Sequence, residues 1–139
     1  MEHELKDHDV ERLAHTLEEG FNRRDVRLIE SVISPHLVDH SAALGGVDLR
    51  QRMARVQAAV PDATYRVEQY MVQGSAIAWR WTIRGRHEQE IMRYPPTGKE
   101  IVMAGMSMAV VRHGKAVEHW EFPDYDHLVA QLDGEASEG

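Results

Sequence analysis

The sequence contains no cysteine and lacks several hallmarks of common protein classes. Without cysteine there is no disulfide, no thiolate metal ligand and no cysteine nucleophile. No apolar run approaches the roughly 20 residues that a helix needs to span a bilayer. The first residues, Met1 to Asp7, are charged rather than apolar, which is unlike a signal peptide. We therefore expect a soluble, cytoplasmic protein with no membrane partner.

Positive charge is also scarce. The chain has 16 Lys and Arg against 23 Asp and Glu, a formal net charge of −7. Nucleic-acid binding needs a basic surface. The one basic patch, Arg80, Arg84 and Arg86, lies on an alternating segment rather than in a cluster of basic and aromatic residues. The composition therefore predicts no nucleic-acid partner.

Motifs for metals, phosphates and serine nucleophiles are missing as well. The chain has 9 histidines, yet it contains no His-Glu-x-x-His motif for zinc. Gly45-Gly46 lacks the flanking pattern of a phosphate-binding loop, and no Gly-x-Ser-x-Gly nucleophile elbow occurs. We expect neither a metal nor a cofactor.

The 139 residues, of which 42% are hydrophobic, are enough for one globular domain with its own core. The first part of the chain is helical in pattern. An apolar stripe predicts a helix over residues 10–21, Asp25 can cap a short helix over 26–33, and Asp48 can cap a helix over 49–60. Residues 36–40 are expected to be extended, and residues 42–46 to form a loop.

The rest of the chain alternates as strands do. We expect strands at residues 65–72, 76–85, 86–93, 101–112 and 116–122, and a short last helix capped by Asp124. Residues 1–7 and 133–139 are expected to be flexible. Helices followed by an antiparallel meander predict an α+β fold, with three N-terminal helices packed on a strongly curved, mostly antiparallel sheet.

The last strand carries the densest chemistry in the chain. Alternation places Val117, His119 and Glu121 on one face and Glu118, Trp120 and Phe122 on the other. On the strand before it, one face is small and mixed, which suits a cavity wall, and the other is wholly apolar. The mixed face comprises Met103, Gly105, Ser107 and Ala109. The apolar face exceeds what three short helices can cover, so we expect a homodimer or a higher homo-oligomer.

Several short motifs, in order and spacing, resemble one known family. They are Phe21-Asn22 with Asp25, Val38-Asp39-His40, Pro61-Asp62, Trp79 to His87, Pro95 to Gly98, Gly114-Lys115, Glu118-His-Trp120 and Gln131-Leu132. Over about residues 8–133 the chain resembles the SnoaL-like polyketide cyclases of the nuclear-transport-factor-like superfamily. The resemblance implies one domain, shaped as a cone with a central pocket, and a dimer.

The resemblance also implies a reaction. In these cyclases an aspartate on the last strand is the acid/base for an intramolecular aldol closure of a polyketide, without metal or cofactor. Its position is taken here by Glu121, which is one methylene longer. A histidine on the preceding strand accompanies that aspartate, and its position is taken here by Ser107. With Glu121 we expect His119 to be catalytic, because the two share a face.

The substrate expected from the resemblance is a hydrophobic, polyketide-like molecule of secondary metabolism. Its binding residues are predicted to be His40, Trp81, His87, Met103 and Ser107. Two alternatives stay open. The same pocket serves hydroxylation, dehydration, isomerisation or epoxide hydrolysis in related proteins, and it can also serve ligand binding without catalysis.

Overall fold

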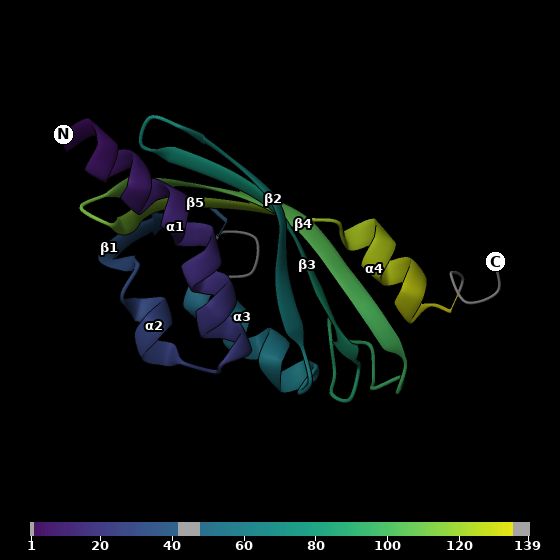
Figure 1. Ribbon diagram of the computed structural model, residues 1–139. Helices are drawn as coiled ribbons and strands as arrows, with labels where there is room; N and C mark the ends of the chain where they lie inside the picture. The colour runs from purple at the N-terminus through teal and green to yellow at the C-terminus, as the bar shows by residue number, and fades with distance from the viewer. Residues whose placement is uncertain (1, 42–47, 135–139) are drawn as a thin grey trace.

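The protein is described here from a computed structural model, which covers residues 2–41 and 48–134, with side chains from residue 9 onward. The predicted loop at 42–46 and the tail from residue 135 lie outside this part. Four helices and one five-stranded sheet are present within it (Figure 1). The helices are α1 (Glu2–Asn22), α2 (Val26–Glu30), α3 (Leu49–Ala59) and α4 (Tyr125–Leu132). The strands are β1 (Ile33–Asp39), β2 (Thr64–Gln73), β3 (Ala76–Arg86), β4 (Glu100–Arg112) and β5 (Lys115–Pro123).

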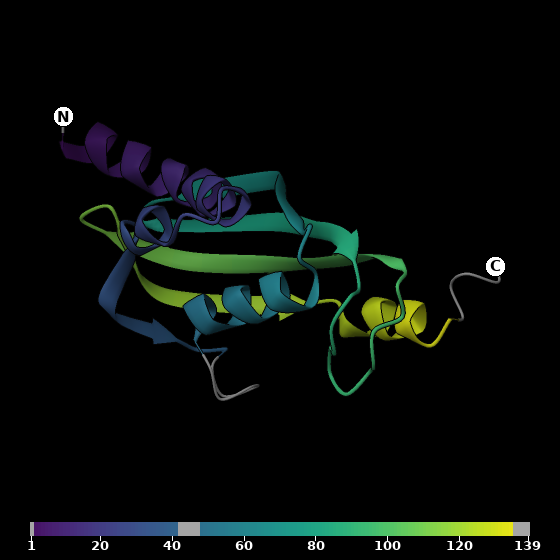
Figure 2. The same cartoon turned by 90° about the horizontal axis from the view of Figure 1, so that it is seen from below.

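The sheet has the strand order β1-β5-β4-β3-β2, and only the β1–β5 pair is parallel. The strands curve together into one layer, with α1 along one side and α3 crossing in front of it (Figure 2). The predicted α+β class with a curved sheet is therefore confirmed. The predicted group of three N-terminal helices is only partly right, because β1 separates α2 from α3 and a fourth helix follows the sheet.

Local sequence explains where the helices begin and which side they bury. The apolar stripe of α1 is fully buried, including Val10, Leu17 and Phe21. Asp25 accepts a hydrogen bond from the Leu28 N–H at the start of α2. Asp48 and Gln51 form a reciprocal capping box at the start of α3. These caps satisfy N–H groups that have no partner inside a helix.

Several predicted boundaries are wrong, among them the start of α1, which lies at Glu2 rather than at Val10. Residues 86–93 do not form a strand; β3 ends at Arg86, and a long loop over 87–99 contains only the isolated bridge Ile91–Tyr94. The backbone of Met92 and Arg93 has positive φ (45° and 74°), which is incompatible with an extended strand. The predicted helix over 26–33 stops at Glu30, because Ile33 already pairs with Ala116 in the sheet.

The open end of the sheet is completed by α4. Strand β5 leaves β4 at the pair Gly105–Pro123, so the first residues of β4 have no strand on that side. The Gln131 side chain of α4 takes the place of the missing strand. It accepts a hydrogen bond from the Val102 N–H and donates one to the Val102 carbonyl, both at 2.8 Å. The helix α4 thus closes the edge of the sheet beside the 87–99 loop. Tyr94 of this loop donates a hydrogen bond to Oδ1 of Asp133, the residue after α4, at 2.8 Å.

At the other edge, Asn22 attaches the end of α1 to β2. Its side-chain amide donates to the Tyr65 carbonyl at 2.9 Å and accepts from the Tyr65 N–H at 2.7 Å. β2 is an edge strand, so these two groups face away from β3 and depend on Asn22. Asn22 therefore fixes the backbone of Tyr65, whose side chain is buried in the core.

We expect Asn22→Ala to lower the free energy of unfolding by about 2 kcal/mol, because both partly buried backbone groups of Tyr65 lose their partner. Urea denaturation measures this change. Gln69→Ala, at an exposed position of the same strand, is the control and should stay within about 0.5 kcal/mol of the unaltered protein. Equal losses in the two variants would contradict the role given to Asn22.

Candidate active site

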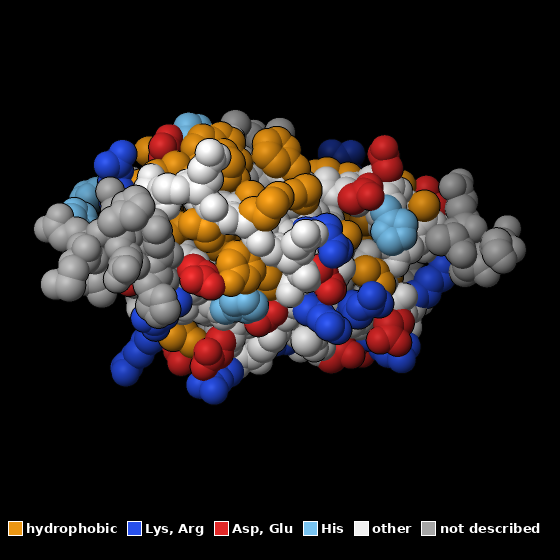
Figure 3. Space-filling model, turned by 45° about the horizontal axis from the view of Figure 1, so that its top comes forward, with side chains coloured by type: hydrophobic (Ala, Val, Ile, Leu, Met, Phe, Trp, Pro, Cys, Tyr) orange, Lys and Arg blue, Asp and Glu red, His pale blue; other side chains and the backbone are white. Residues whose placement is uncertain are grey.

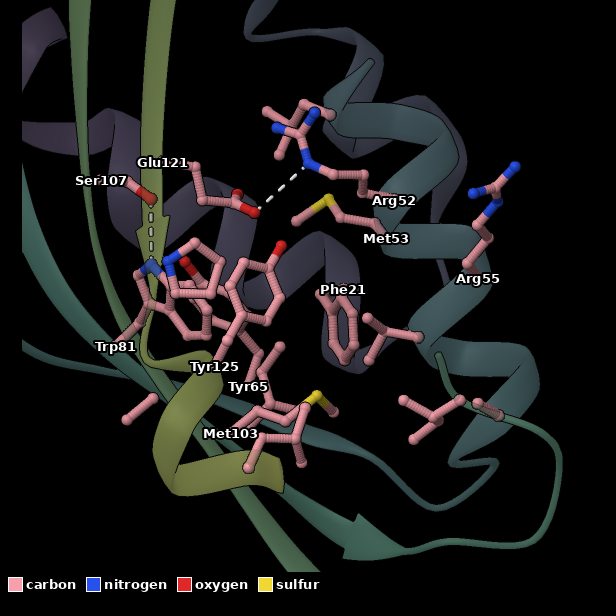
Figure 4. Close-up of a pocket in the computed structure, with 18 of the residues that line it drawn as sticks. Phe21, Arg52, Met53, Arg55, Tyr65, Trp81, Met103, Ser107, Glu121 and Tyr125 are labelled. Carbon is pink, nitrogen blue, oxygen red and sulfur yellow. Dashed lines mark hydrogen bonds and ion pairs between the residues drawn. The ribbon is translucent and has the colours of Figure 1, made fainter. Parts of the chain in front are cut away.

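A cavity of about 520 Å³ lies between the concave side of the sheet, α3, α4 and residues 89–92 of the loop. Most of its wall is apolar, from Phe21 of α1 and Met53 of α3 to Trp81 and Met103 of the sheet (Figure 4). Its size is within the range of small-molecule sites. Few polar groups face it, so each of them bears on what the pocket can bind.

One arginine joins two carboxylates at the pocket wall. Nε of Arg52 lies 3.3 Å from Oε2 of Glu121, and its Nη2 lies 3.0 Å from Oδ2 of Asp39 (Figure 4 shows the first contact). All three side chains are largely buried. The arginine comes from α3 and the carboxylates from β5 and β1. The contact therefore places the Glu121 carboxylate in the pocket and ties α3 to the sheet.

Asp39 in turn holds His119. Its Oδ1 lies 3.3 Å from Nδ1 of His119, in a pair of neighbouring strand residues with almost no exposed side-chain surface. Burial raises the pKa of Asp39, but the hydrogen bond and charge of His119, the Ser41 N–H and the charge of Arg52 outweigh burial and lower it from 3.8 to about 2. An ionised Asp39 can only accept, so Nδ1 of His119 carries the proton in this contact.

This arrangement leaves the other ring nitrogen of His119 for the pocket. Nε2 is buried and has no hydrogen-bond partner within residues 9–41 and 48–134, where side chains are described. His119 lines the cavity together with Glu121. When the ring is neutral, Nε2 is a hydrogen-bond acceptor. An oriented imidazole and a carboxylate thus share one apolar cavity.

Ser41 fixes the end of the strand that carries these groups. Its Oγ accepts from the Glu121 N–H at 2.6 Å and lies 3.2 Å from the Glu121 carbonyl oxygen, to which it donates. Its own N–H donates to Oδ1 of Asp39 at 3.1 Å. The backbone of β5 is therefore held at Glu121 itself by Ser41, the second residue after β1.

Five of the seven predicted site residues lie in this pocket: His119, Glu121, Trp81, Met103 and Ser107. The pairs Ser107–Glu121 and Ala109–His119 put both strands' mixed faces toward the cavity. A bulge at Val110–Val111 breaks the predicted alternation before that point, so Ala116 is buried where Val117 was expected.

The other two predicted binding residues, His40 and His87, do not line the pocket. His40 is exposed, stacks on Trp120 at 4.4 Å and pairs with Glu118 on the far side of the strand. His87 is fully buried at the base of the 87–99 loop, where its Nδ1 accepts from the Thr97 N–H. This cavity is therefore lined without these two histidines.

Sequence comparison places the chain among known proteins. The family model for SnoaL-like polyketide cyclase matches residues 11–132. The chain belongs to the SnoaL-like polyketide cyclase family. No curated protein sequence matches it.

Several solved structures share the fold over most of this chain. IdmH, a candidate polyketide cyclase from Streptomyces antibioticus, is 30% identical, with a TM-score of 0.77 over 89% of this chain and 98% of its own. AclR, a candidate hydroxylase from Streptomyces galilaeus, is 25% identical, with a TM-score of 0.80 over 92% of this chain and 98% of its own. TsrD from Streptomyces laurentii, at 21% identity and a TM-score of 0.79, shares the fold.

Within this SnoaL-like site, the residues that the sequence did not single out are Arg52, Ser41 and Tyr65, and Asp39 appeared only as part of the motif Val38-Asp39-His40, without a role. Arg52 comes three residues after Leu49 and directly before Met53, so it lies beside the buried face of α3. This position was a weak signal that it faces inward. Within the residues that the structure describes, no group of three or more acidic or histidine side chains is arranged to hold a metal. Within the same residues, no helix is long and apolar enough to cross a membrane.

The pKa of Asp39 predicts how stability depends on pH. Because the folded-state value (about 2) is below the ordinary 3.8, the charged form stabilises the fold above pH 3.8, and this is lost as the pH falls through 2. The difference corresponds to about 2 kcal/mol. In urea denaturation between pH 4 and pH 2, the free energy of unfolding of Asp39→Asn should fall by about 2 kcal/mol less than that of the unaltered protein. Asp126→Asn, at an exposed position, is the control and should behave like the unaltered protein. If the free energy of unfolding of Asp39→Asn falls as much as that of the unaltered protein, the lowered pKa of Asp39 is contradicted.

Proposed function

We propose that this SnoaL-like protein is a cofactor-independent enzyme that closes a ring in a hydrophobic polycarbonyl substrate by intramolecular aldol addition. The observation that supports this most is the Glu121 carboxylate, held by Arg52 at the wall of a mostly apolar cavity. A carboxylate in such a place can remove a proton from carbon when neighbouring carbonyl groups stabilise the resulting charge. The apolar wall would hold the rest of the substrate in a reactive conformation.

The proposed reaction needs one group to move a proton twice. Glu121 takes a proton from the carbon next to a carbonyl, and the electron pair of that C–H bond passes into an enolate. The enolate carbon attacks a second carbonyl carbon of the same molecule, and the oxygen of that carbonyl becomes an alkoxide. The alkoxide takes the proton back from Glu121. The product is an isomer of the substrate, so no oxidant, reductant or cofactor is consumed.

His119 is the second group in this proposal. Asp39 fixes its ring and the proton on Nδ1, which leaves Nε2 to interact with a substrate hydroxyl or enol. The contact with Asp39 would also stabilise a positive charge on the ring during proton transfer. We therefore keep His119 with Glu121 as the proposed catalytic pair. Trp81, Met103 and Ser107 are the proposed binding residues.

Hydroxylation in the same pocket is a second candidate, because AclR, the candidate hydroxylase, superposes on this chain with a TM-score of 0.80. Mass spectrometry separates the candidates. Aldol addition leaves the mass unchanged, hydroxylation adds one oxygen traceable with labelled O₂ or water, and dehydration removes water. Binding without turnover would indicate a ligand-binding protein instead.

We expect Glu121→Gln to reduce kcat by about 10²-fold or more, because the amide cannot accept the proton. The assay uses aromatic polyketides that carry a β-keto ester side chain opposite an acceptor carbonyl, with the isomeric product followed by liquid chromatography. Glu118→Gln is the matched control on the opposite face of β5, and it should stay within about two-fold. Unchanged turnover in Glu121→Gln would rule out its role.

We also propose that the protein forms a homodimer through the outer face of β4 and β5. Met106 pairs with Phe122 and Met108 with Trp120, so these four side chains form one apolar block. Phe122 is 65% exposed and Met106 48% exposed. Figure 3 shows hydrophobic side chains gathered on the face turned away from α3. A second copy, presenting the same block, would cover it.

Phe122→Glu should convert this dimer to a monomer, because the dimer would bury an unpaired charge. Light scattering after size-exclusion chromatography measures the mass in solution. Val26→Glu, at a site on α2 that is 69% exposed, is the control and should leave the mass unchanged. A monomeric unaltered protein would refute the proposed dimer.

A further inference from the structure

Two hydroxyl groups in the pocket wall are each held by the indole of a tryptophan. Nε1 of Trp79 donates to Oη of Tyr65 at 2.8 Å, and Nε1 of Trp81 donates to Oγ of Ser107 at 2.9 Å. All four side chains are buried, and all four line the cavity. The two tryptophans are alternate residues of β3, so they project from the same face of the sheet.

The direction of these hydrogen bonds determines what the hydroxyls can still do. An indole N–H only donates, so both oxygens must accept. Each hydroxyl still has one proton to donate. Neither Tyr65 nor Ser107 donates a side-chain hydrogen bond to any partner in residues 9–41 and 48–134. Each therefore has a donor available for a ligand in the cavity.

Packing keeps both hydroxyls in place. The ring of Tyr65 stacks on Trp81 with centroids 5.9 Å apart and contacts Phe21 at 5.5 Å. Trp81 can lie over β4 because its cross-strand partner is Gly105, where a Cβ would come within 2.5 Å of the indole. The same glycine lets the indole reach Ser107, two residues further along β4. The two donors are thus preorganised before any ligand binds.

Both donors lie near the proposed base. Ser107 and Glu121 are directly opposite each other in the β4–β5 pair, and Figure 4 shows both projecting into the same space as Trp81. Burial raises the pKa of the Tyr65 hydroxyl well above its ordinary 10, Trp79 opposes this, and the charges of Glu121 and Glu18 add to it. Tyr65 therefore keeps its proton and can act as a donor.

We propose that Tyr65 and Ser107 form a subsite for the two oxygens of a 1,3-dicarbonyl enolate. This inference rests on the proposed function and names its substrate class. When Glu121 removes a proton from the carbon between two carbonyl groups, the electron pair of the broken C–H bond spreads over both oxygens. Each oxygen then accepts one hydrogen bond, from Tyr65 or from Ser107. A substrate with a single isolated carbonyl would leave one buried donor unsatisfied, which disfavours it.

The test uses a stable aromatic enol, 1-hydroxy-2-acetonaphthone, whose two oxygens are placed like those of a 1,3-dicarbonyl enol. Glu121→Gln serves as the background, because it mimics the protonated acid that follows proton removal. Absorbance titration of the bound probe should show its ionisation at least one pH unit lower than in water. Adding Tyr65→Phe or Ser107→Ala should weaken binding of the ionised probe ten-fold or more and reverse most of this shift.

Two controls keep the result specific. Tyr70→Phe removes a hydroxyl that bonds to Glu11 outside the pocket, and it should leave the probe's affinity and ionisation unchanged. Each variant should bind 2-ethylnaphthalene, which has no oxygen, with an affinity within about two-fold of that of the Glu121→Gln protein. Such an affinity confirms that the pocket is folded. If a hydroxyl variant does not fold, the Glu121→Gln protein still tests the proposal. A bound probe that ionises there at the same pH as in water would overturn it.

The outcomes also separate this inference from the proposed function. If the hydroxyl variants lose affinity for the ionised probe ten-fold and the unaltered protein shows no turnover, the enolate subsite stands and the cyclase is rejected. Turnover that depends on Glu121, with hydroxyl variants that bind the ionised probe as tightly as the background, would overturn the subsite alone.

Discussion

The contact of Arg52 with Asp39 and Glu121 is the interaction on which the site depends. It joins α3 to two strands, β1 and β5, across the cavity. A buried charge without a partner destabilises a fold by several kcal/mol, whereas a satisfied cluster is close to neutral. Its main effect is therefore geometric: it fixes one carboxylate in the pocket and a second beneath His119, and it holds α3 over an open space.

The cavity follows from how the sheet is built. The strands curve around it, α1 covers one part of the concave side, and α4 replaces β5 at the edge of β4 through Gln131. Gly105 removes a side chain where Trp81 needs room. Because the wall is apolar and tightly packed, its few polar groups act in surroundings of low dielectric constant, where hydrogen bonds and charges interact strongly.

Two departures from the family pattern acquire a physical meaning in this structure. The resemblance seen in the sequence assigns the position of the cyclases' aspartate to Glu121, whose carboxylate here meets a guanidinium. It assigns the position of their histidine to Ser107, which accepts a hydrogen bond from Trp81. An imidazole is present nonetheless: His119 faces the same cavity, from the strand that carries the carboxylate.

Much of the fold and part of the site could be predicted from the sequence. Periodicity and capping residues determined the helices around Val10 to Phe21 and after Asp48. Alternation placed His119 with Glu121 on one face of the last strand and Ser107 on the mixed face of the strand before it, because these patterns are local. The first part of the loop, residues 87–93, was missed because positive φ at Met92 and Arg93 leaves no mark in alternation. Only the tertiary structure brought Arg52 to Glu121 and Asp39, moved His40 and His87 out of the pocket, and joined Trp79 to Tyr65. Those contacts link residues far apart in the chain, and their partners are decided by strand register and by the curvature of the sheet, which no local pattern records.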